Sequence, residues 1–407
     1  MKRHYTQLLQ EYLGYFPCVV ILGPRQSGKT TLLKGLPADW KIFDVEKRSD
    51  YTVISQDPDL FLRINPSHIA IDEAQFLPDL FPALRVAIDS NREKKGRFVI
   101  TGSSSPDLVK SISESLAGRV GFIEISPFLS TEALNLPQSS FFKIISEGKD
   151  VVDLLGNIPV VSSLGHVHDY WFRGGYPEPW IKSSSRFQNV WMENYIQSYL
   201  NRDILRLFPN LNKEKYQKFL GILSDLSGTI INYSEVARAL GISVPTVIDY
   251  FEIAHGSFLW RKIPSYEKNA IKRIVKHPKG YIRDSGLLNH LLHIRDSKHL
   301  LSHPKAGHLW EGMVAEEIIR GFNAIGDECG CYYYRTSAGG EVDLVIEGRF
   351  GIVPIEIKYG QNVDPRELRP IKDFISERGC QYGIVINNDE KPRLYAENLI
   401  GVPFSCI

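Results

Sequence analysis

The stretch "CVVILGPRQSGKTTLLKGL", from Cys18 to Leu36, decides the fold of the first part of this chain. Five apolar residues predict a buried strand, a loop follows, and the run after the loop has the composition of a helix. The loop fits the pattern G-x-x-x-x-G-K-T, which in a strand–loop–helix context is typical of a nucleotide-binding P-loop. We therefore expect residues 1–175 to fold as an α/β P-loop ATPase domain.

The chemistry expected of this loop is phosphate binding. Its backbone N–H groups would surround the phosphates of ATP. Lys29 would reach the β and γ phosphates, and Thr30 would be a ligand of Mg²⁺. The predicted nucleotide-binding residues are Gly23, Pro24, Arg25, Gln26, Ser27, Gly28, Lys29, Thr30, Thr31 and Asp72.

Two further strands carry polar residues at their ends. In "SHIAIDEAQF" a short apolar run ends in an acidic pair. Asp72 is expected to hold Mg²⁺ through its water shell, and Glu73 to orient and deprotonate the attacking water. The strand in "GRFVITGSSSPDL" ends in hydroxyl groups that either position this water or cap a helix, at Thr101, Ser103 and Ser104.

Arg119 lies in "SLAGRVGFIEISPF", after a helix and just before a strand. An arginine in this place can complete the site of a neighbouring subunit by stabilising charge on the transferred phosphoryl group. A surface arginine without a role is the alternative. The order of these parts resembles the AAA-type ATPases, and that resemblance implies a homo-oligomer. The turn "GGYP" at 174–177 then marks the junction with the next domain.

Residues 176–300 are predicted to form a helical and winged-helix domain. Two short amphipathic helices, 233–240 and 243–254, flank Gly241, and a strand containing "FLW" follows. The second helix offers Asp249 and Glu252 and no Lys or Arg, so it suits base reading poorly. Positive charge follows it instead, at Arg261, Lys262, Lys268, Lys272, Arg273, Lys276 and Lys279.

The charge of the whole chain is only +1, but it is unevenly distributed. Residues 181–310 hold 19 Lys and Arg against 10 Asp and Glu. Such an excess suits contact with DNA phosphates without sequence recognition. A winged helix with a structural or protein-binding role is the alternative.

The last region, 301–407, contains the hairpin "GGEVDLVIEGRFGIVPIEIKYG" at 339–360. Side chains alternate along a strand, so Glu356 and Lys358 share one face. A turn at Gly348 and Arg349 would bring Asp343 opposite 354–356. In the preceding helix Glu311 shares a face with apolar residues, and an inward carboxylate is costly unless it is paired or binds a metal. A solvated strand face is the alternative.

This region resembles the restriction-endonuclease-like D…E-x-K nucleases, including the archaeal Holliday-junction resolvases. The residues that match are Gly307, Glu311, Glu341, Asp343, Glu356 and Lys358. The whole chain resembles bacterial and archaeal AAA-type ATPases with a C-terminal domain of unknown function, through "GPRQSGKT", "LAGRV", "GGYP", "YLNRDI" and "EVDLVI…IEIK". The resemblance implies an α/β nuclease-like fold for 301–407.

A metal-dependent role follows from the charges of the nuclease-like site. Asp343 and Glu356 would hold Mg²⁺, with Glu311 completing or orienting the metal shell. Lys358 would steady the nucleophile or the developing charge. A nuclease-like fold that only binds DNA or a protein is the alternative, because a fold does not establish an activity.

The composition fits a chain of several globular domains: 407 residues, 43% hydrophobic and 23% charged. No apolar run is long enough for a membrane span, and the N-terminus lacks the pattern of a signal peptide, so we expect a cytoplasmic protein without membrane partners. Five cysteines without a C-x-x-C pair are expected to be reduced thiols.

Together these patterns predict an ATPase that uses ATP and Mg²⁺ and couples its nucleotide state to DNA binding, with metal-dependent DNA cleavage by the C-terminal domain as an added activity. The alternative is a signalling or scaffold NTPase whose C-terminal domains bind a protein partner and do not cleave.

Overall fold

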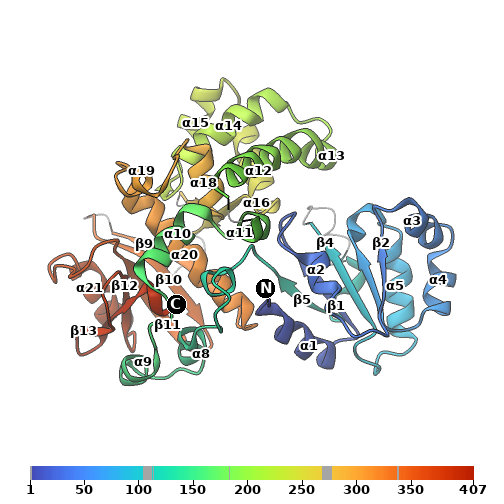
Figure 1. The fold of residues 1–407 in the computed structure, drawn as a ribbon, viewed down its shortest axis with the longest axis horizontal. Helices are drawn as coiled ribbons and strands as arrows, with labels where there is room; N and C mark the ends of the chain where they lie inside the picture. The colour runs from blue at the N-terminus through green and yellow to red at the C-terminus, as the bar shows by residue number, and fades with distance from the viewer. Residues whose placement is uncertain (1, 104–111, 113, 183, 268–276, 337–338) are drawn as a thin grey trace. The chain divides into compact units, whose positions relative to one another are not determined.

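The computed structural model describes residues 2–103, 112, 114–182, 184–267, 277–336 and 339–407. These residues form two compact units (Figure 1). The first unit holds Met1–Pro127 together with Gly256–Phe258 and Asn323–Gly326. The second unit holds Phe128–His255, Leu259–Phe322 and Asp327–Ile407. The domain boundaries predicted at 175 and 300 stay predictions.

A five-stranded parallel sheet lies at the centre of the first unit, in the order β2-β3-β4-β1-β5. The strands predicted around the P-loop, the acidic pair and Thr101 are confirmed. Since β4 lies between β1 and β3, the polar residues that follow these three strands gather at one edge of the sheet. The strands are β1 Cys18–Leu22, β2 Lys41–Asp44, β3 Ile69–Asp72, β4 Phe98–Gly102 and β5 Val120–Glu124.

Helices cover this sheet and bury its centre. Residues Cys18 to Ile21 of β1 are fully buried, as expected for a parallel strand covered on both faces. Phe61, Leu84 and Ile100 belong to the core on one side of the sheet. The helices are α1 Tyr5–Tyr15, α2 Lys29–Leu33, α3 Arg48–Ser55, α4 Pro58–Ile64, η1 Ala74–Phe76 and α5 Leu80–Asp89.

The second unit begins with a run of helices. The predicted Gly174–Gly175 turn lies between two of them, α10 and α11, and its glycines are needed for close packing. Gly174 has φ 72°, and a Cβ on Gly175 would lie 2.3 Å from the carbonyl oxygen of Phe128. The elements are α7 Ser130–Ala133, α8 Ser140–Ser146, α9 Val151–Asn157, α10 Leu164–Arg173, α11 Pro177–Lys182, α12 Ser185–Ser198, η2 Tyr199–Asp203 and α13 Ile204–Leu207.

In its described residues, the middle of the chain forms three helices and a small antiparallel sheet in the order β6-β8-β7. The two predicted amphipathic helices are confirmed as α15 and α16. A strand follows them as predicted, but it begins later, because β7 shares only Trp260 with the predicted "FLW". The winged-helix assignment stays a prediction. The elements are α14 Lys213–Asp225, β6 Thr229–Ile230, α15 Tyr233–Leu240, α16 Val244–Gly256, β7 Trp260–Ile263 and β8 Lys279–Ile282.

The C-terminal part contains a six-stranded mixed sheet, in the order β13-β14-β12-β11-β10-β9. The predicted helix around Glu311, the hairpin and the following helix and strand are confirmed as α20, β10–β11, α21 and β12. The elements are α18 Ser285–Leu291, α19 Ser297–Leu301, α20 Ala306–Ala324, β9 Gly330–Arg335, β10 Glu341–Gly348, β11 Gly351–Ile357, α21 Arg369–Arg378, β12 Gly383–Asn387, β13 Arg393–Ala396, β14 Leu399–Pro403 and η3 Phe404–Cys406.

The hairpin turns one residue later than predicted, because Gly348 pairs with Gly351 and leaves Arg349 and Phe350 as the turn. The register Leu344↔Ile355 places Asp343 opposite Glu356, within the predicted range. β11 is an inner strand, and Glu356 is only 5% exposed. The alternative of a solvated strand face is therefore wrong.

Two expectations from composition can be compared with the structure. Across the described parts of the chain, no helix combines the length and the apolar character that a membrane span requires. All five cysteines are free thiols, as expected.

Candidate functional site

The P-loop joins β1 to α2 and adopts an unusual backbone. Gln26 has φ 59° and Gly28 has φ 96°. The left-handed conformation costs a residue other than glycine about 1–3 kcal/mol, and such strain collects at ligand-binding sites. Ser27 is fully buried and closes the loop, because its Oγ donates to the carbonyl of Pro24 at 2.8 Å.

Lys29 directly follows this loop, as the first residue of α2. Its side chain is buried, and its Nζ donates to the carbonyls of Gly23 and Pro24, both at 3.0 Å. Nζ also lies 4.0 Å from Glu73 Oε1. Phosphate oxygens are stronger partners for an ammonium group than neutral carbonyls. Lys29 could therefore exchange these carbonyls for phosphate oxygens, and its binding of a triphosphate stays a prediction.

Asp72 lies between two hydroxyl groups. Thr30 Oγ1 donates to Asp72 Oδ2 at 2.6 Å, and Thr101 Oγ1 donates to Asp72 Oδ1. A hydroxyl and a carboxylate are the donor types that Mg²⁺ prefers beside a nucleotide. The residues present therefore fit a nucleotide-bound Mg²⁺ held by Thr30 and Asp72. Thr101 orients the carboxylate, a role that differs from the one expected for the hydroxyls of this strand.

Glu73 follows β3 in a left-handed conformation, with φ 56°. Its backbone N–H donates to Thr101 Oγ1 at 3.2 Å, and its carboxylate accepts from Gln75 Nε2 at 2.6 Å. The same amide of Gln75 donates to Ser103 Oγ at 3.0 Å. Sequence reasoning missed Gln75, since a glutamine two residues after an acidic pair carries no signal of its own. Ser104 lies outside the described residues.

Arg119 lies just before β5 and is held by α5. Its Nε and Nη2 donate to the two carboxylate oxygens of Asp89, at 2.7 and 2.9 Å. The hydrogen bond from Arg119 holds the pKa of Asp89 below its usual value. Nothing in this geometry tests the predicted role in a neighbouring subunit, but that role requires the Asp89 pair to open.

The other predicted P-loop residues lie around the loop. Arg25 contacts Glu46 at 3.5 Å, and Thr31 is exposed. Sequence reasoning missed Arg3, which precedes α1. Its buried guanidinium donates to the carbonyl of Ser27 and, at 2.7 Å, to the carbonyl of Ser126. Arg3 therefore holds the loop in place from the N-terminal segment. Its partner Ser27 lies 24 residues further along the sequence.

A second group of charged residues gathers in the second unit. Asp343 Oδ2 accepts from the backbone N–H of Ile357 at 2.8 Å. Burial, and after it the charges of Glu311 and Glu356, raises the pKa of Asp343 well above its usual value. The three carboxylates predicted from the sequence therefore do influence one another. We call Glu311, Glu341, Asp343 and Glu356 the acidic site.

Two lysines neutralise part of the acidic site. Lys358 Nζ lies 2.9 Å from Glu356 Oε1, as the shared strand face predicted. Lys279 of β8 lies 2.5 Å from Glu311 Oε1 and 2.7 Å from Glu341 Oε1. Lys279 was predicted from the sequence to contact DNA phosphates. In the structure it is buried, with 2% of its surface exposed. This expectation for Lys279 is not met, because its charge is satisfied by carboxylates inside the protein.

The partners of Glu311 explain its ionisation. Tyr281 OH donates to Glu311 Oε1 at 2.6 Å, and His308 Nδ1 lies 3.7 Å from Oε2. Burial alone would raise the pKa of Glu311, but Lys279 with His308 and Tyr281 outweighs it and lowers the pKa. Glu356 behaves differently, because burial raises its pKa and Lys358 offsets this only in part.

The acidic site does not fit a metal ion as it stands. No three His, Cys, Asp or Glu side chains in the described parts of the chain converge closely enough to hold a metal ion. Glu311 is already occupied by Lys279 and Tyr281. One acceptor is left over, because the buried Oε2 of Glu356 has no hydrogen-bond partner among the described residues. The roles of Glu311, Asp343 and Glu356 as metal ligands stay predictions.

The predicted basic cluster after α16 divides into different environments. Arg261 donates to Glu316, which is only 2% exposed, and Lys262 pairs with Glu252 at the surface, at 2.8 Å. Four members lie outside the described residues: Lys268, Lys272, Arg273 and Lys276. Of the three that are described, only Lys262 presents its charge to solvent.

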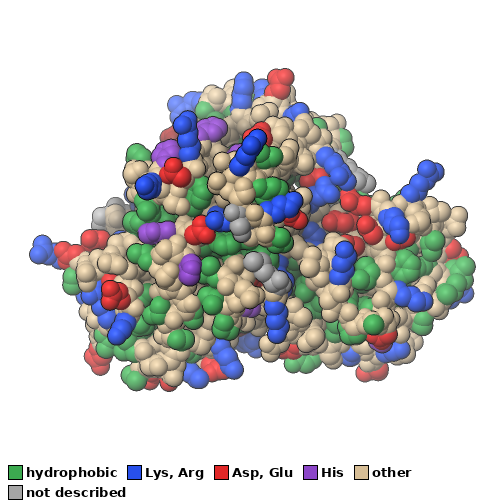
Figure 2. Space-filling model, in the orientation of Figure 1, with side chains coloured by type: hydrophobic (Ala, Val, Ile, Leu, Met, Phe, Trp, Pro, Cys, Tyr) green, Lys and Arg blue, Asp and Glu red, His purple; other side chains and the backbone are tan. Residues whose placement is uncertain are grey.

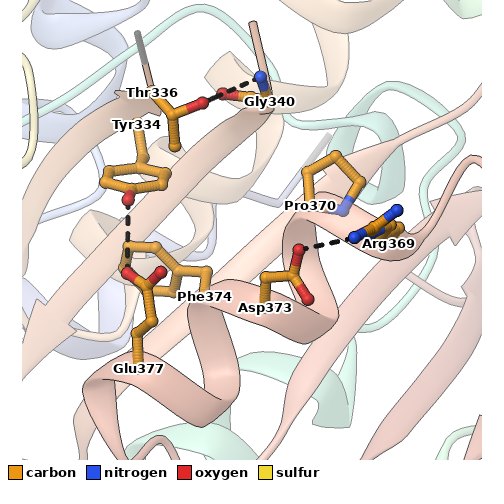
Figure 3. A pocket seen from close by; sticks show the side chains of 8 residues that line it. All are labelled: Tyr334, Thr336, Gly340, Arg369, Pro370, Asp373, Phe374 and Glu377. Atoms are coloured by element: carbon orange, nitrogen blue, oxygen red, sulfur yellow. Dashed lines mark hydrogen bonds and ion pairs between the residues drawn. The ribbon is translucent and has the colours of Figure 1, made fainter. Parts of the chain in front are cut away.

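A pocket of about 460 Å³ lies between the end of β9 and α21 (Figure 3). Its polar groups pair with one another: Tyr334 OH contacts Glu377 at 3.5 Å, and Arg369 contacts Asp373 at 3.6 Å. None of the residues of the acidic site lines it. The pocket therefore does not contribute to the predicted chemistry.

Comparisons with known proteins divide the chain into three matched parts. The family model described as an AAA domain matches residues 15–134. Two models described as domains of unknown function, DUF8612 and DUF4143, match residues 164–298 and 306–407.

Relatives are similar over most of the chain. The uncharacterized protein Rv2008c of Mycobacterium tuberculosis is 34% identical over 348 residues, which cover 85% of this chain and 71% of that protein. The uncharacterized protein MJ1544 of Methanocaldococcus jannaschii is 24% identical over 391 residues, covering 91% and 82%. Among solved structures, a Walker-type ATPase of Pyrococcus abyssi has a TM-score of 0.40 at 17% identity, covering 71% of this chain and 94% of that one.

Proposed function

We propose that this chain, which belongs to the same family as the mycobacterial protein Rv2008c, hydrolyses ATP at its P-loop and couples its nucleotide state to DNA binding by its second unit. The chain carries an AAA-type P-loop ATPase domain and a C-terminal domain of unknown function. The observation that carries the proposal is the meeting of Lys29, Thr30, Asp72 and Glu73 at one edge of the sheet.

Each residue of this edge has a task in the proposed hydrolysis. Lys29 would leave the loop carbonyls and bind the β and γ phosphates. Thr30 and Asp72 would hold Mg²⁺, which when bound supplies positive charge against the phosphates. Glu73 would orient the attacking water and accept its proton. In a homo-oligomer, Arg119 would leave Asp89 and stabilise the transferred phosphoryl group of a neighbouring subunit.

The ATPase proposal is tested by Glu73→Gln in the full-length chain. Because this change removes the base but keeps the phosphate-binding loop, we expect ATP turnover to fall at least about 100-fold while ATP binding persists. Glu93→Gln changes an exposed acid of the same unit and is the matched control. Unchanged turnover in Glu73→Gln would reject Glu73 as the base.

For DNA, the support comes from exposed positive charge in the second unit. Lys and Arg side chains project from the surface over α14 and α15 (Figure 2), where Lys213, Lys218 and Arg238 are exposed. With Lys262 these residues would contact phosphates without recognising bases. Arg261 and Lys279 would not take part, because buried carboxylates hold them.

Salt dependence tests this contact. We expect DNA affinity to fall steeply as salt rises, and the slope to decrease by about 3 in the triple variant Lys213→Ala, Lys218→Ala, Arg238→Ala. A matched triple variant in the first unit removes the same charge at Lys47, Lys94 and Lys95, which are also exposed. Equal loss in both triple variants would assign the effect to net charge.

DNA cleavage by Asp343, Glu356 and Lys358 is the finer part of the proposal. It rests on the face of the sheet that they share and on the buried Oε2 of Glu356, which has no hydrogen-bond partner among the described residues. The test incubates branched and linear DNA with Mg²⁺ or Mn²⁺ and compares the parent with Glu356→Ala. Equal cleavage by both proteins would discard this site.

A protein partner is the second candidate, and one surface favours it. α16 presents Val244, Ile248, Asp249 and Glu252 to solvent, a mixture of apolar and acidic side chains that would repel a phosphate backbone. A signalling or scaffold NTPase would use such a surface. A DNA affinity that is weak and insensitive to salt would support this candidate.

A further inference from the structure

Lys279 is the deeply buried lysine that contacts the acidic site from outside the C-terminal domain. It begins β8, within the segment matched at 164–298, whereas the carboxylates lie within 306–407. Its ammonium contacts Glu311 and Glu341 at 2.5 and 2.7 Å. An isolated buried ammonium is very costly, so these contacts are needed to keep it in place.

We propose that Lys279 is a resident cation of the acidic site, and that the site accepts a divalent cation only when Lys279 is removed. The inference rests on the proposed function only for the identity of the site's residues, and it predicts no metal-dependent cleavage by the acidic site while Lys279 is in place. Its physical basis is competition for the same oxygen atoms. A carboxylate that forms a close ion pair with an ammonium has no free oxygen to offer on that side.

The surroundings hold Lys279 firmly. β8 is the middle strand of its sheet, paired with β6 and β7. Tyr281, two residues further along β8, points to the same side and donates to Glu311. Next to β8, Tyr333 of β9 donates from its OH to the carbonyl of His277 at 2.6 Å. Lys279 is therefore a fixed part of the site and not a mobile surface residue.

The carboxylate oxygens that remain without Lys279 would suit a cation with a higher charge than the single charge of an ammonium group. Four carboxylates face two lysines, Lys279 and Lys358. Glu356 is 5% exposed and its Oε2 has no hydrogen-bond partner among the described residues. Once Lys279 is absent, Glu311 and Glu341 also lack their cation. Hard oxygen ligands of this kind suit Mg²⁺, Mn²⁺ or Ca²⁺.

The experiment measures Mn²⁺ binding to the full-length chain without nucleotide, by electron paramagnetic resonance of free Mn²⁺ and by thermal unfolding. The variants are Lys279→Met, which keeps the length of the side chain, and the double variant Lys279→Met, Glu356→Gln. Lys262→Met, which removes an exposed lysine of the same small sheet, is the matched control. Mn²⁺ that remains in the double variant belongs to another site, such as the P-loop.

We expect Lys279→Met to unfold at a lower temperature than the parent and to recover several degrees with Mn²⁺, because a ligand that binds the folded state stabilises it. The parent, Lys262→Met and the double variant should show no such recovery. Bound Mn²⁺ in the parent that is lost in Glu356→Gln would overturn the proposal. So would a folded Lys279→Met that binds no Mn²⁺ dependent on Glu356.

If Lys279→Met does not fold, Lys279→Gln provides the same test with a side chain that can hydrogen bond to Glu311, and the parent compared with Glu356→Gln remains decisive by itself. These readouts do not involve ATP turnover or DNA. Mn²⁺ binding by Lys279→Met, together with no metal-dependent DNA cleavage by the parent, would support the resident cation and reject the cleavage proposal. Metal-dependent cleavage by the parent that is lost in Glu356→Ala would support the cleavage proposal and overturn the resident cation.

Discussion

The nucleotide site and the acidic site use the same chemical groups in opposite ways. In the nucleotide site, Lys29 donates to two neutral carbonyls and lies 4.0 Å from the nearest oxygen of Glu73 in their ion pair. In the acidic site, Lys279 lies within 2.7 Å of two carboxylates. A lysine held by carbonyls can exchange them for phosphate, whereas a lysine held by two carboxylates, of which Glu311 is buried, has its charge already matched. The comparison teaches that the partners of a lysine, and not its presence alone, decide whether a site can bind a ligand.

Among the substitutions that test this comparison, the removal of Lys29 is expected to have the largest effect, and the quantity affected is ATP turnover. Lys29→Ala should lower ATP turnover by about 1,000-fold or more, since the lysine would contact the transferred phosphate. The measurement is phosphate release at saturating ATP. Lys34→Ala, an exposed lysine directly after α2, is the matched control and should keep parental turnover. Turnover that survives in Lys29→Ala would remove the P-loop assignment.

Removing Lys279 should affect stability and not ATP turnover. Breaking a buried ion pair by deleting one partner costs about 3–5 kcal/mol, so Lys279→Met should lower the free energy of unfolding by that amount. Lys358→Met should cost less, about 1–2 kcal/mol, because the side chain of Lys358 is 28% exposed and solvent screens part of its ion pair. Urea denaturation of both variants measures the difference. Equal losses would show that the two lysines are equivalent.

A third prediction compares two residues of the basic cluster: Arg261, which is paired with the buried Glu316, and Lys262, which is exposed to solvent. Arg261→Ala should destabilise the fold by about 2–3 kcal/mol, since among the described residues Glu316 would keep Arg283 and Arg320, at 3.5 and 3.3 Å. Lys262→Ala should change stability by less than about 0.5 kcal/mol.

Binding to DNA should reverse this order. Lys262→Ala should reduce the salt dependence of affinity by about one counterion, and Arg261→Ala should leave it unchanged. Titrations of labelled DNA at several salt concentrations measure both slopes. A reduced slope in Arg261→Ala would place that arginine on the DNA after all.

The smallest effect is expected from pH at the edge of the acidic site. The contact with Glu311 raises the pKa of His308 above its usual value. The folded state therefore holds the proton more tightly than the unfolded chain. This stabilisation is complete below the usual histidine pKa of about 6.5 and is lost as pH rises through the higher folded value.

His308→Gln should thus lower stability at about pH 5.5 and have no such effect well above the folded pKa. The side chain of His308 is 56% exposed, so solvent screens the pair and the loss should stay within about 0.2–1 kcal/mol. Thermal unfolding across pH measures it. A loss that is independent of pH would assign the effect to packing.

The placement of the predicted nucleotide-binding residues could be worked out from the sequence because the parts of this region are local. Gly23 to Thr31 are consecutive, and Asp72 and Thr101 each end an apolar run that identifies a strand. A parallel sheet then brings strand ends together by rule. Two residues were missed: Gln75, which carries no signal of its own, and Arg3, which contacts the loop from a helix start that carries no motif.

The acidic site could be predicted only in part. Alternation along the hairpin placed Glu356 and Lys358 on one face, and turn geometry placed Asp343 near them to within one residue. Lys279 lies 62 residues before Glu341 and looked like one basic residue among many. No periodicity signals a contact between two different sheets, so its burial was beyond sequence reasoning.

The start of β8 inside the acidic site has a consequence for how this chain can be divided. A fragment that begins at residue 301 keeps all four acids but leaves their main base behind. Such a fragment would carry repelling, unmatched charge in its interior, whatever its sequence similarity suggests about independence. We therefore do not expect the C-terminal domain to fold independently of β8. A fusion that transfers this domain to another protein has to include the small sheet of β6, β8 and β7.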